Sequence, residues 1–431
     1  MRMRAAAVLF SVSAAAVAGV PAAGVRFGQS APAPFVGVLD EHPAIAYESR
    51  PVRDPISRLN LALADGSVTL THDGEQGYLG SVLDALKVPR DSQMLVFSKS
   101  GVQGDLTGPR NPRALLFNDA VVVSYVRGAP LLELTAHDPE QGVIFYTLPQ
   151  QPGRPVIFTR RGACLTCHVS YSTAEVPGLL TRSMATAADG QVLPQLGNFD
   201  VDQRTPLAQR WGGWFVTGTH GGMTHLGNAT ASLADAAGPA IGPQTLNQRT
   251  LEGKTDLSGY PSAHSDIVAL LVFQHETRMV NLLTRLNWEA RVAEADYGQA
   301  ASGRDAVTAI VDELVDYALF VGEAPLTARV EGTSSFMRTF PAAGPRDARG
   351  RSLRDLDLTT RLMRYPCSYM LYVEAFDSLP AGARAAVYGR LWGILSGAVT
   401  GPRYAHLSAG DRRAIIEILR ETKPGLPAYF F

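Results

Sequence analysis

The segment 113-RALLFNDAVVVSYV-126 is rich in Val, Leu, Phe and Tyr, which are residue types that favour β-strands. Similar short apolar runs occupy residues 93–99, 130–136, 142–148 and 155–160. Glycine, proline, asparagine and aspartate separate these runs, as in RGAP (127–130) and HDPEQG (137–142), and these residues favour hairpin turns. The pattern predicts an antiparallel β region in the N-terminal half of the chain.

The second half of the chain changes to helical periodicity. Apolar residues recur at helical spacing through residues 264–295. Shorter stretches of the same style follow at residues 305–321, 354–376, 382–397 and 408–421. Residues 172–260, between the two halves, are glycine-rich and weakly periodic, which indicates loops with short elements. We therefore expect an α+β fold with a β-containing N-terminal half and an all-helical C-terminal half.

The composition excludes several classes of protein. The chain has 431 residues, of which 46% are hydrophobic and 18% charged, as is ordinary for a soluble globular protein. Its net charge of −1 gives no strong field that would attract nucleic acid or an anionic membrane. Three cysteines are too few for a disulfide scaffold. One of them, Cys367, is expected to be a buried apolar thiol.

The N-terminus has the pattern of a secretory signal peptide. Arg2 and Arg4 precede an uncharged, alanine-rich run over residues 5–25, with small residues suited to cleavage up to Ala23. An uncleaved membrane anchor is the alternative, because the run is about long enough to span a bilayer. Its weak hydrophobicity favours removal, and no later segment is apolar for long enough to span. We expect an exported protein with a signal peptide at residues 1–23 and no stable membrane insertion.

The other two cysteines lie in 160-RRGACLTCHVSYS-172, as Cys164 and Cys167, and His168 follows directly. C-x-x-C-H is the attachment signature of c-type haem. Two thiols at this spacing reach the two vinyl groups of haem, and the next residue supplies the proximal iron ligand. A zinc site would need a second cysteine or histidine pair, and a thioredoxin-like dithiol would need a βαβ unit. The motif therefore predicts one covalently bound haem c, held by Cys164 and Cys167 and ligated by His168.

Over CLTCH (164–168) the chain resembles a bacterial c-type cytochrome. It is not similar to the compact class I cytochrome c fold, in which a short chain begins with the helix that carries the motif. A looser resemblance links it to large bacterial proteins with a single-haem cytochrome domain. That resemblance runs through RALLFND (113–119), CLTCHVS (164–170), RWGGWFVTGTHGGMTHLGN (210–228) and SDIVALLVFQHET (265–277). It implies haem binding and export to the periplasm.

These observations divide the chain into three parts. After the signal peptide, residues 24–258 are expected to form an α+β region that carries the haem attachment site. Residues 259–431 are expected to form a helical region packed on it.

The second axial ligand is expected in the glycine-rich segment 210–228. This segment offers His220, Met223 and His225, and its glycines would let the backbone approach a flat macrocycle closely. We predict His220 as the second iron ligand, beside His168. His225 and Met223 remain alternatives.

His275 is a rival outside that segment. It shares a face of the predicted helix with His264, eleven residues earlier, where an apolar stripe also favours a core role. Met279 in the same region is expected to be a core residue. Met184 follows His168 by only sixteen residues, which is short for a distal loop. The remaining histidines lie in turn-like sequence.

The favoured function is one-electron transfer between redox partner proteins through a single haem. The alternative is a haem enzyme of peroxidase-like type, because the chain is far longer than one electron-carrying haem requires. Against that alternative, c-type peroxidases usually carry two C-x-x-C-H motifs. A redox or gas sensor would normally add an output domain or a spanning helix, and neither is evident. The sequence therefore assigns no catalytic residue.

Overall fold

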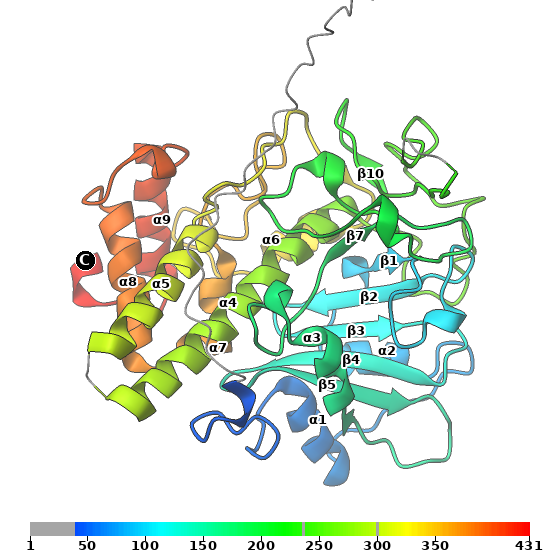
Figure 1. The fold of residues 1–431 in the computed structure, drawn as a ribbon, viewed down its shortest axis with the longest axis horizontal. Helices are drawn as coiled ribbons and strands as arrows, with labels where there is room; N and C mark the ends of the chain where they lie inside the picture. The colour runs from blue at the N-terminus through cyan, green and yellow to red at the C-terminus, as the bar shows by residue number, and fades with distance from the viewer. Residues whose placement is uncertain (1–38, 235–237, 299–300) are drawn as a thin grey trace, which may run out of the picture. The chain divides into compact units, whose positions relative to one another are not determined.

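The computed structural model describes residues 39–431 apart from 235–237 and 299–300, and Figure 1 shows this part of the chain. The predicted signal peptide, residues 1–23, lies outside the described residues. The predicted α+β class is confirmed, with a mostly antiparallel sheet in the N-terminal half and helices in the C-terminal half. No helix within the described part of the chain has the length and apolar character needed to cross a membrane.

The β region forms one seven-stranded antiparallel sheet in the order β6-β5-β4-β3-β2-β1-β9. Its strands are β1 (Met94–Val96), β2 (Arg113–Asn118), β3 (Val121–Tyr125), β4 (Leu131–Asp138), β5 (Gly142–Pro149), β6 (Thr159–Arg160) and β9 (Trp214–Phe215). Two smaller pairs join β7 (Arg182–Met184) to β8 (Asn198–Asp200), and β10 (Gly218–Thr219) to β11 (Glu331–Gly332). Every predicted strand run therefore contributes to the main sheet, although β6 keeps only two residues of the run at 155–160.

Side chains of the turn residues hold the hairpins together. Asn118 Oδ1 accepts hydrogen bonds from the backbone N–H groups of Ala120 and Val121, at 3.1 and 3.0 Å, in the turn between β2 and β3. Asp138 Oδ1 does the same for Glu140 and Gln141 between β4 and β5, at 2.9 and 2.8 Å. These side chains bind backbone N–H groups of the turns. This is why asparagine and aspartate mark the turns in the sequence.

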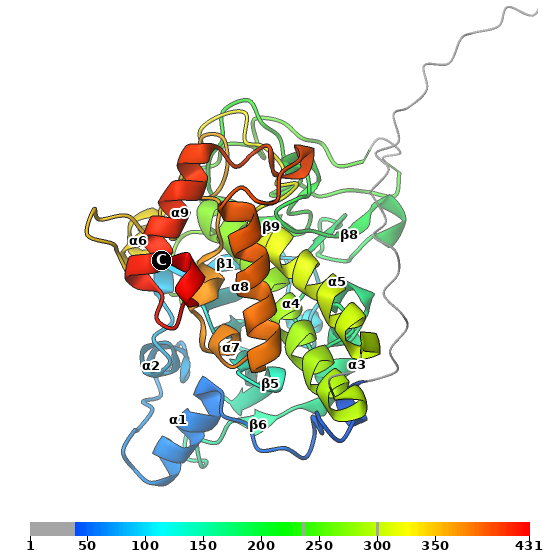
Figure 2. The ribbon, with the colours of Figure 1, turned by 90° about the vertical axis from the view of Figure 1, so that its left-hand side faces the viewer.

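The helices are α1 (Pro55–Ala64), α2 (Leu79–Ala85), α3 (Leu165–His168), α4 (Ile267–Tyr297), α5 (Ala301–Ala318), α6 (Phe336–Ala342), α7 (Glu374–Asp377), α8 (Ala381–Leu395) and α9 (Ala409–Thr422). The helix predicted over 264–295 is α4, whose middle is buried on all sides. Figure 2 shows α8 between α5 and α9, and both of these helices contact it. The C-terminal helices thus pack onto α4 in succession, through α5 and α8.

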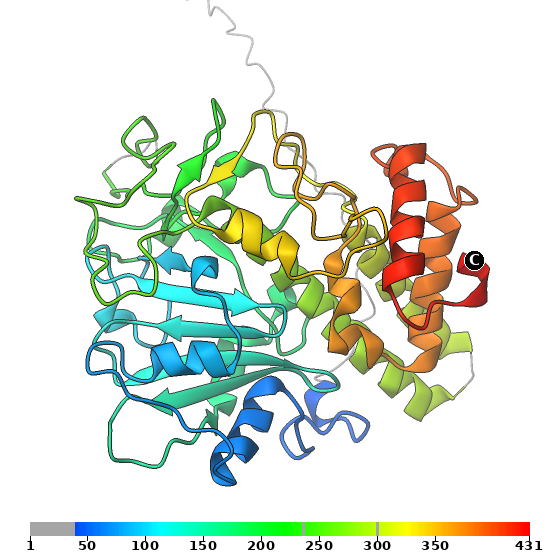
Figure 3. The same cartoon turned by 180° about the vertical axis from the view of Figure 1, so that it is seen from behind.

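Alternation along the strands gives the sheet two covered faces. Leu116, Val123 and Leu134 point to one face and share a buried cluster with α1 and α2. Phe117 and Phe145 point to the other, where the ring of Phe117 lies 5.0 Å from that of Phe273 on α4. Figures 1 and 3 show α2 and α4 on opposite faces. The motif helix α3 lies on this face too, since the ring of His168 contacts that of Phe145.

Residues 354–376 were expected to be helical, and most of them are not. Helix occurs only at Tyr369–Tyr372, as a 3-10 turn, and in α7. Asp357 Oδ1 accepts hydrogen bonds from the backbone N–H groups of Thr359 and Thr360, at 2.8 and 2.7 Å, and Leu358 has a φ of 60°. Side chains that bind nearby backbone donors compete with helix formation, and Pro366 cannot continue a helix.

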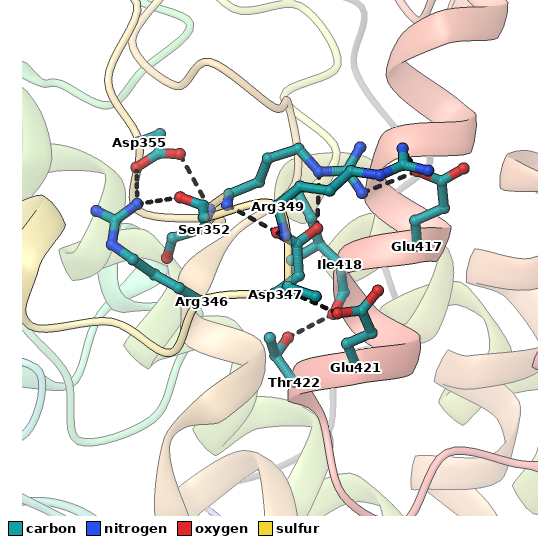
Figure 4. A network of polar contacts seen from close by, with 12 residues as sticks. Arg346, Asp347, Arg349, Ser352, Asp355, Glu417, Ile418, Glu421 and Thr422 are labelled. Carbon is teal, nitrogen blue, oxygen red and sulfur yellow. Dashed lines mark hydrogen bonds and ion pairs between the residues drawn. The ribbon is translucent and has the colours of Figure 1, made fainter.

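A polar network fastens the loop before this segment to α9 (Figure 4). Arg351 bridges Asp347 and Glu417, with nitrogen–oxygen distances of 2.7 and 2.8 Å. Arg349 also binds Glu417, and Glu421 accepts a hydrogen bond from the backbone of Ala348 at 2.6 Å. The last long helix is therefore held to the loop by charged side chains as well as by its apolar face.

Candidate haem attachment site

The two motif cysteines occupy one turn of helix beside the edge of the sheet. Strand β6 leads into a 3-10 turn at Gly162–Cys164, and α3 follows as Leu165–His168. Cys164 is half-buried, Cys167 is exposed, and neither forms a disulfide. Residues three apart on a helix are neighbours on its surface, so the two thiols present themselves to the same side. Burial raises the pKa of Cys164, with a further contribution from the carboxylate of Glu133.

One ring nitrogen of His168 forms a hydrogen bond, and the other keeps its lone pair. Its Nδ1 lies 2.8 Å from the carbonyl oxygen of Gly178, and its ring lies 4.7 Å from that of Phe145 on β5. A carbonyl can only accept, so Nδ1 carries the proton and Nε2 keeps its lone pair. Burial lowers the pKa of His168, and the charges of Arg113 and Arg182 lower it further. The ring is therefore neutral near pH 7 and presents Nε2 as a metal ligand.

The carbonyl that orients His168 is itself fixed by α4. The side-chain amide of Asn281 accepts a hydrogen bond from the N–H of Leu179 at 2.8 Å and donates to its carbonyl at 2.9 Å. A Cβ atom at Gly178 would lie 2.5 Å from Asn281 Oδ1, so the close approach requires glycine. A hydrogen bond to the second nitrogen of a metal-bound histidine sets its tautomer and orientation. Sequence reasoning missed Gly178 and Asn281, because no spacing connects them to the motif.

Buried and half-buried polar side chains on the sheet lie close to the motif. Arg113 of β2 and Glu133 of β4 act electrostatically on His168 and Cys164 respectively, and Ser124 of β3 pairs with Glu133 in register. Glu133 carries a charge opposite to that of Arg113, and Arg113 Nε is buried without a hydrogen-bond partner among the described residues. A buried guanidinium with an unpaired N–H group suits a carboxylate partner, and haem carries two propionates. The residues around the motif therefore fit a haem, which Cys164, Cys167 and His168 would hold.

Comparison of the chain with protein-family models, curated proteins and solved structures found no match. The site must therefore be interpreted from its own residues.

The structure does not bring His220 to His168. The ring of His168 packs on β5, whereas His220 follows β9 and β10 beyond the opposite edge of the sheet. Five strand spacings separate β5 from β9, or about 24 Å at about 4.8 Å each. Figure 1 likewise shows α3 near β4 and β5 and β10 beyond β1. This arrangement speaks against His220 as a ligand of an iron bound at His168.

The hydrogen bonds of the two neighbouring histidines lead to the same conclusion. His220 is fully buried, and its Nε2 lone pair accepts the backbone N–H of Asn247 at 3.2 Å. His225 accepts the N–H of Gly227 at Nδ1, at 3.0 Å, and its ring lies 4.8 Å from that of His220. Burial lowers the pKa of His225 to about 3. Both rings are neutral packing partners in a turn.

The glycines of this segment serve the contact between β10 and its neighbours. A Cβ atom at Gly218 would lie 2.8 Å from the carbonyl oxygen of Glu331 on β11. The close backbone approach predicted from the glycines is therefore present, but its partner is another strand.

The other candidate ligands are engaged in the protein interior. His275 is fully buried, with Nδ1 2.5 Å from Gln203 Oε1 and Nε2 2.7 Å from Ser368 Oγ. Its ring stacks on Phe320 at 4.6 Å. The sulfur of Met223 accepts the backbone N–H of Thr327 at 3.3 Å.

Two further sulfur residues behave as the sequence predicts. Cys367 and Met279 are fully buried in the core, which confirms that neither is available as a surface ligand. Burial raises the pKa of Cys367 to about 12, so it remains a thiol.

Proposed function

We propose that the protein is an exported c-type cytochrome that carries one covalently bound haem and transfers single electrons between redox partners. The observation that carries the proposal is the hydrogen bond from His168 Nδ1 to the carbonyl of Gly178, inside a C-x-x-C-H turn. This bond leaves Nε2 free to bind iron, as a proximal ligand requires. The haem supplies the one-electron chemistry when bound.

The chain's own residues attach and orient the group. Cys164 and Cys167 would hold the haem as thioethers, each thiol adding across one vinyl group and giving its proton to the other vinyl carbon. His168 would supply the iron ligand through Nε2, with its ring oriented by the carbonyl of Gly178. Arg113 and Arg182 are cations close enough to His168 to lower its pKa, and they suit the propionates. Because Cys167 is exposed, its side of a bound haem would be open to a partner protein.

The test is covalent attachment in cells equipped for haem c maturation. The wild-type protein should keep its haem in a denaturing gel, and Cys164→Ser with Cys167→Ser should lose it. Cys367→Ala is the matched control, because it removes the cysteine outside the motif and should retain the haem. A wild-type protein whose haem is extracted by acid and organic solvent would overturn the proposal.

A second measurement concerns the peroxidase-like alternative. Electron transfer requires no open coordination position, whereas a peroxidase must bind its substrate at the iron. The proposal is supported if the wild-type protein exchanges electrons with a redox partner but catalyses the oxidation of a reduced dye by peroxide only slowly. Fast turnover by the wild-type protein would favour the enzyme.

A further inference from the structure

An open cleft of about 690 Å³ lies beside the start of α4, away from the haem motif. Its walls are residues 89–91 before β1, residues 261–264 before α4, and residues 333–339, which lead into α6 (yellow in Figure 3). Strand β1 is four strand spacings from β5, where His168 packs, or about 19 Å at about 4.8 Å each. Small-molecule sites usually have volumes of about 300–1,000 Å³, so the cleft has the size of a ligand site.

Two fully buried side chains, Gln93 and Asp266, hold the walls of the cleft in place. Gln93 donates through Nε2 to the carbonyl oxygens of Ser262 and His264, at 2.7 and 2.8 Å. Asp266 Oδ2 accepts the backbone N–H of Thr333 on the opposite wall, at 2.8 Å. The cleft is therefore formed before a ligand arrives, and binding requires little ordering of the chain.

The carboxylate on the lining, that of Asp91, is occupied by the protein itself. Its Oδ2 accepts hydrogen bonds from the hydroxyls of Ser335 and Thr339, at 2.5 and 2.7 Å. Its Oδ1 is buried, so a ligand in the cleft does not reach it. Asp84, which pairs with Arg90 at 2.7 Å, is not on the lining. A ligand thus meets no exposed and uncommitted carboxylate oxygen.

Most polar groups that line the cleft without a partner are hydrogen-bond donors. Arg338 is exposed, and its guanidinium forms no ion pair or hydrogen bond with any residue that the structure describes. Ser262 Oγ accepts the N–H of His264 at 3.2 Å, which leaves its own proton uncommitted. Neither ring nitrogen of His264 is bonded within the described part of the chain. Arg90 gives only part of its five N–H groups to Asp84.

We propose that this cleft binds a small molecule through a carboxylate or phosphate group, as a second site that is separate from haem attachment. The planar guanidinium of Arg338 can give two parallel hydrogen bonds to either oxyanion, and Arg90 adds a second cation on the same lining. A cationic ligand is disfavoured, because the lining carboxylate is already bonded to two hydroxyls. A neutral ligand would leave the strongest uncommitted donor, Arg338, without a charged partner.

The test is isothermal titration calorimetry of the full-length protein with inorganic phosphate and, separately, with succinate. Saturable binding of either anion at one site supports the proposal, and the anion that binds more tightly identifies the group. Arg338→Gln should weaken that binding at least about tenfold, because a charge-assisted pair is lost. Arg338→Lys should restore only part of the affinity, because an ammonium group cannot form the two parallel bonds. Arg329→Gln is the matched control and should bind as wild type, because Arg329 is exposed and pairs with Glu331 instead.

A site-specific measurement shows whether the anion enters the cleft. The imidazole signal of His264 in nuclear magnetic resonance, assigned with His264→Gln, should shift as the bound anion is added to the wild-type protein. The same addition to Arg338→Gln should leave the signal in place. The proposal is overturned if neither anion binds with a dissociation constant below about 10 mM. It is also overturned if Arg338→Gln binds as tightly as wild type, or if binding leaves the His264 signal unchanged.

Discussion

His168 and His275 differ in what their ring nitrogens contact. His168 gives Nδ1 to a carbonyl and keeps Nε2 free, on a surface turn. His275 has both nitrogens bonded, to Gln203 and Ser368, between aromatic rings in the core. Two residues of one type thus take separate roles, one able to bind a metal and the other able only to join parts of the interior.

His275→Ala should lower the free energy of unfolding without changing the haem. Gln203 and Ser368 would be left as buried polar groups without their partner, at a cost of about 1–3 kcal/mol each. Urea unfolding should show a loss of about 3 kcal/mol or more, while the ferric spin state stays that of wild type. Ser368→Ala should show part of the same loss. A change in spin state on replacing His275 would make it a ligand after all.

The motif could be predicted at this scale because its chemistry is local. Cys164, Cys167 and His168 are neighbours in the chain, so their spacing alone sets their geometry. What the segment around His220 packs against could not be predicted, because it depends on which strands pair. The glycines around His220 would look the same whether they packed on a macrocycle or on β11.

At the scale of elements, Asp266 joins the start of α4 to a distant loop. Its Oδ1 accepts the N–H groups of Val268 and Ala269, at 2.8 and 3.3 Å, and caps the helix. Its Oδ2 accepts the N–H groups of Thr333 and Ser334, at 2.8 and 2.7 Å. One fully buried carboxylate therefore serves four backbone donors from two segments.

Asp266→Ala should be much more costly than loss of an exposed cap. A helix cap is worth about 0.5–2 kcal/mol, and each buried donor left unpaired adds about 1–3 kcal/mol. We expect a loss of about 4 kcal/mol or more in urea unfolding followed by circular dichroism. Ser408→Ala removes the exposed cap of α9 and should cost about 1 kcal/mol. Equal losses in the two variants would show that the loop contacts contribute nothing.

The network of Figure 4 should make the free energy of unfolding depend on pH in the acid range. Burial raises the pKa of Asp347, but the backbone N–H and guanidinium of Arg351 outweigh it and hold that pKa below its usual value. A depressed carboxyl pKa stabilises the fold above the unfolded value, near 4, and this contribution is lost as pH falls through the folded value. Asp347→Asn should therefore destabilise the protein at pH 7 and have less effect at pH 3. A constant difference in unfolding free energy across that range would contradict this account.

Most elements could be predicted from periodicity, since strands and the long helix repeat their apolar residues at the expected intervals. The segment 354–376 could not, because apolar spacing does not reveal that Asp357 would bind backbone donors of its own turn.

Across the whole molecule, one buried cluster contains residues of the sheet, of α4 and of the C-terminal helices. Phe117 on β2 and Phe273 on α4 meet in it, as do Leu391 on α8 and Ile418 on α9. Residues 39–431 belong to a single compact unit. The two halves that differ in periodicity therefore share a core, which the sequence suggested only as packing of one region on another.

Phe273→Ala should weaken both halves together. Replacing a buried phenylalanine by alanine costs about 3–5 kcal/mol. In a Trp288→Phe, Trp392→Phe background, only Trp211 and Trp214 near the sheet emit. Their fluorescence and the circular dichroism of the helices should shift to lower urea by the same amount. Leu61→Ala, on the exposed side of α1, should leave both midpoints within about 0.5 kcal/mol of wild type. Separate midpoints for the two probes would show independent halves.

The contact of Asn281 with Leu179 also has a consequence for the order of events during synthesis. The motif leaves the ribosome before Asn281 is made, so nothing yet holds the carbonyl that orients His168. Chains are made from the N-terminus, and contacts between distant segments form late. The thiols are thus available to an attachment system while the turn is still pliable. Under the proposed function, attachment would come first, and docking of α4 would then lock the ring of His168 in place.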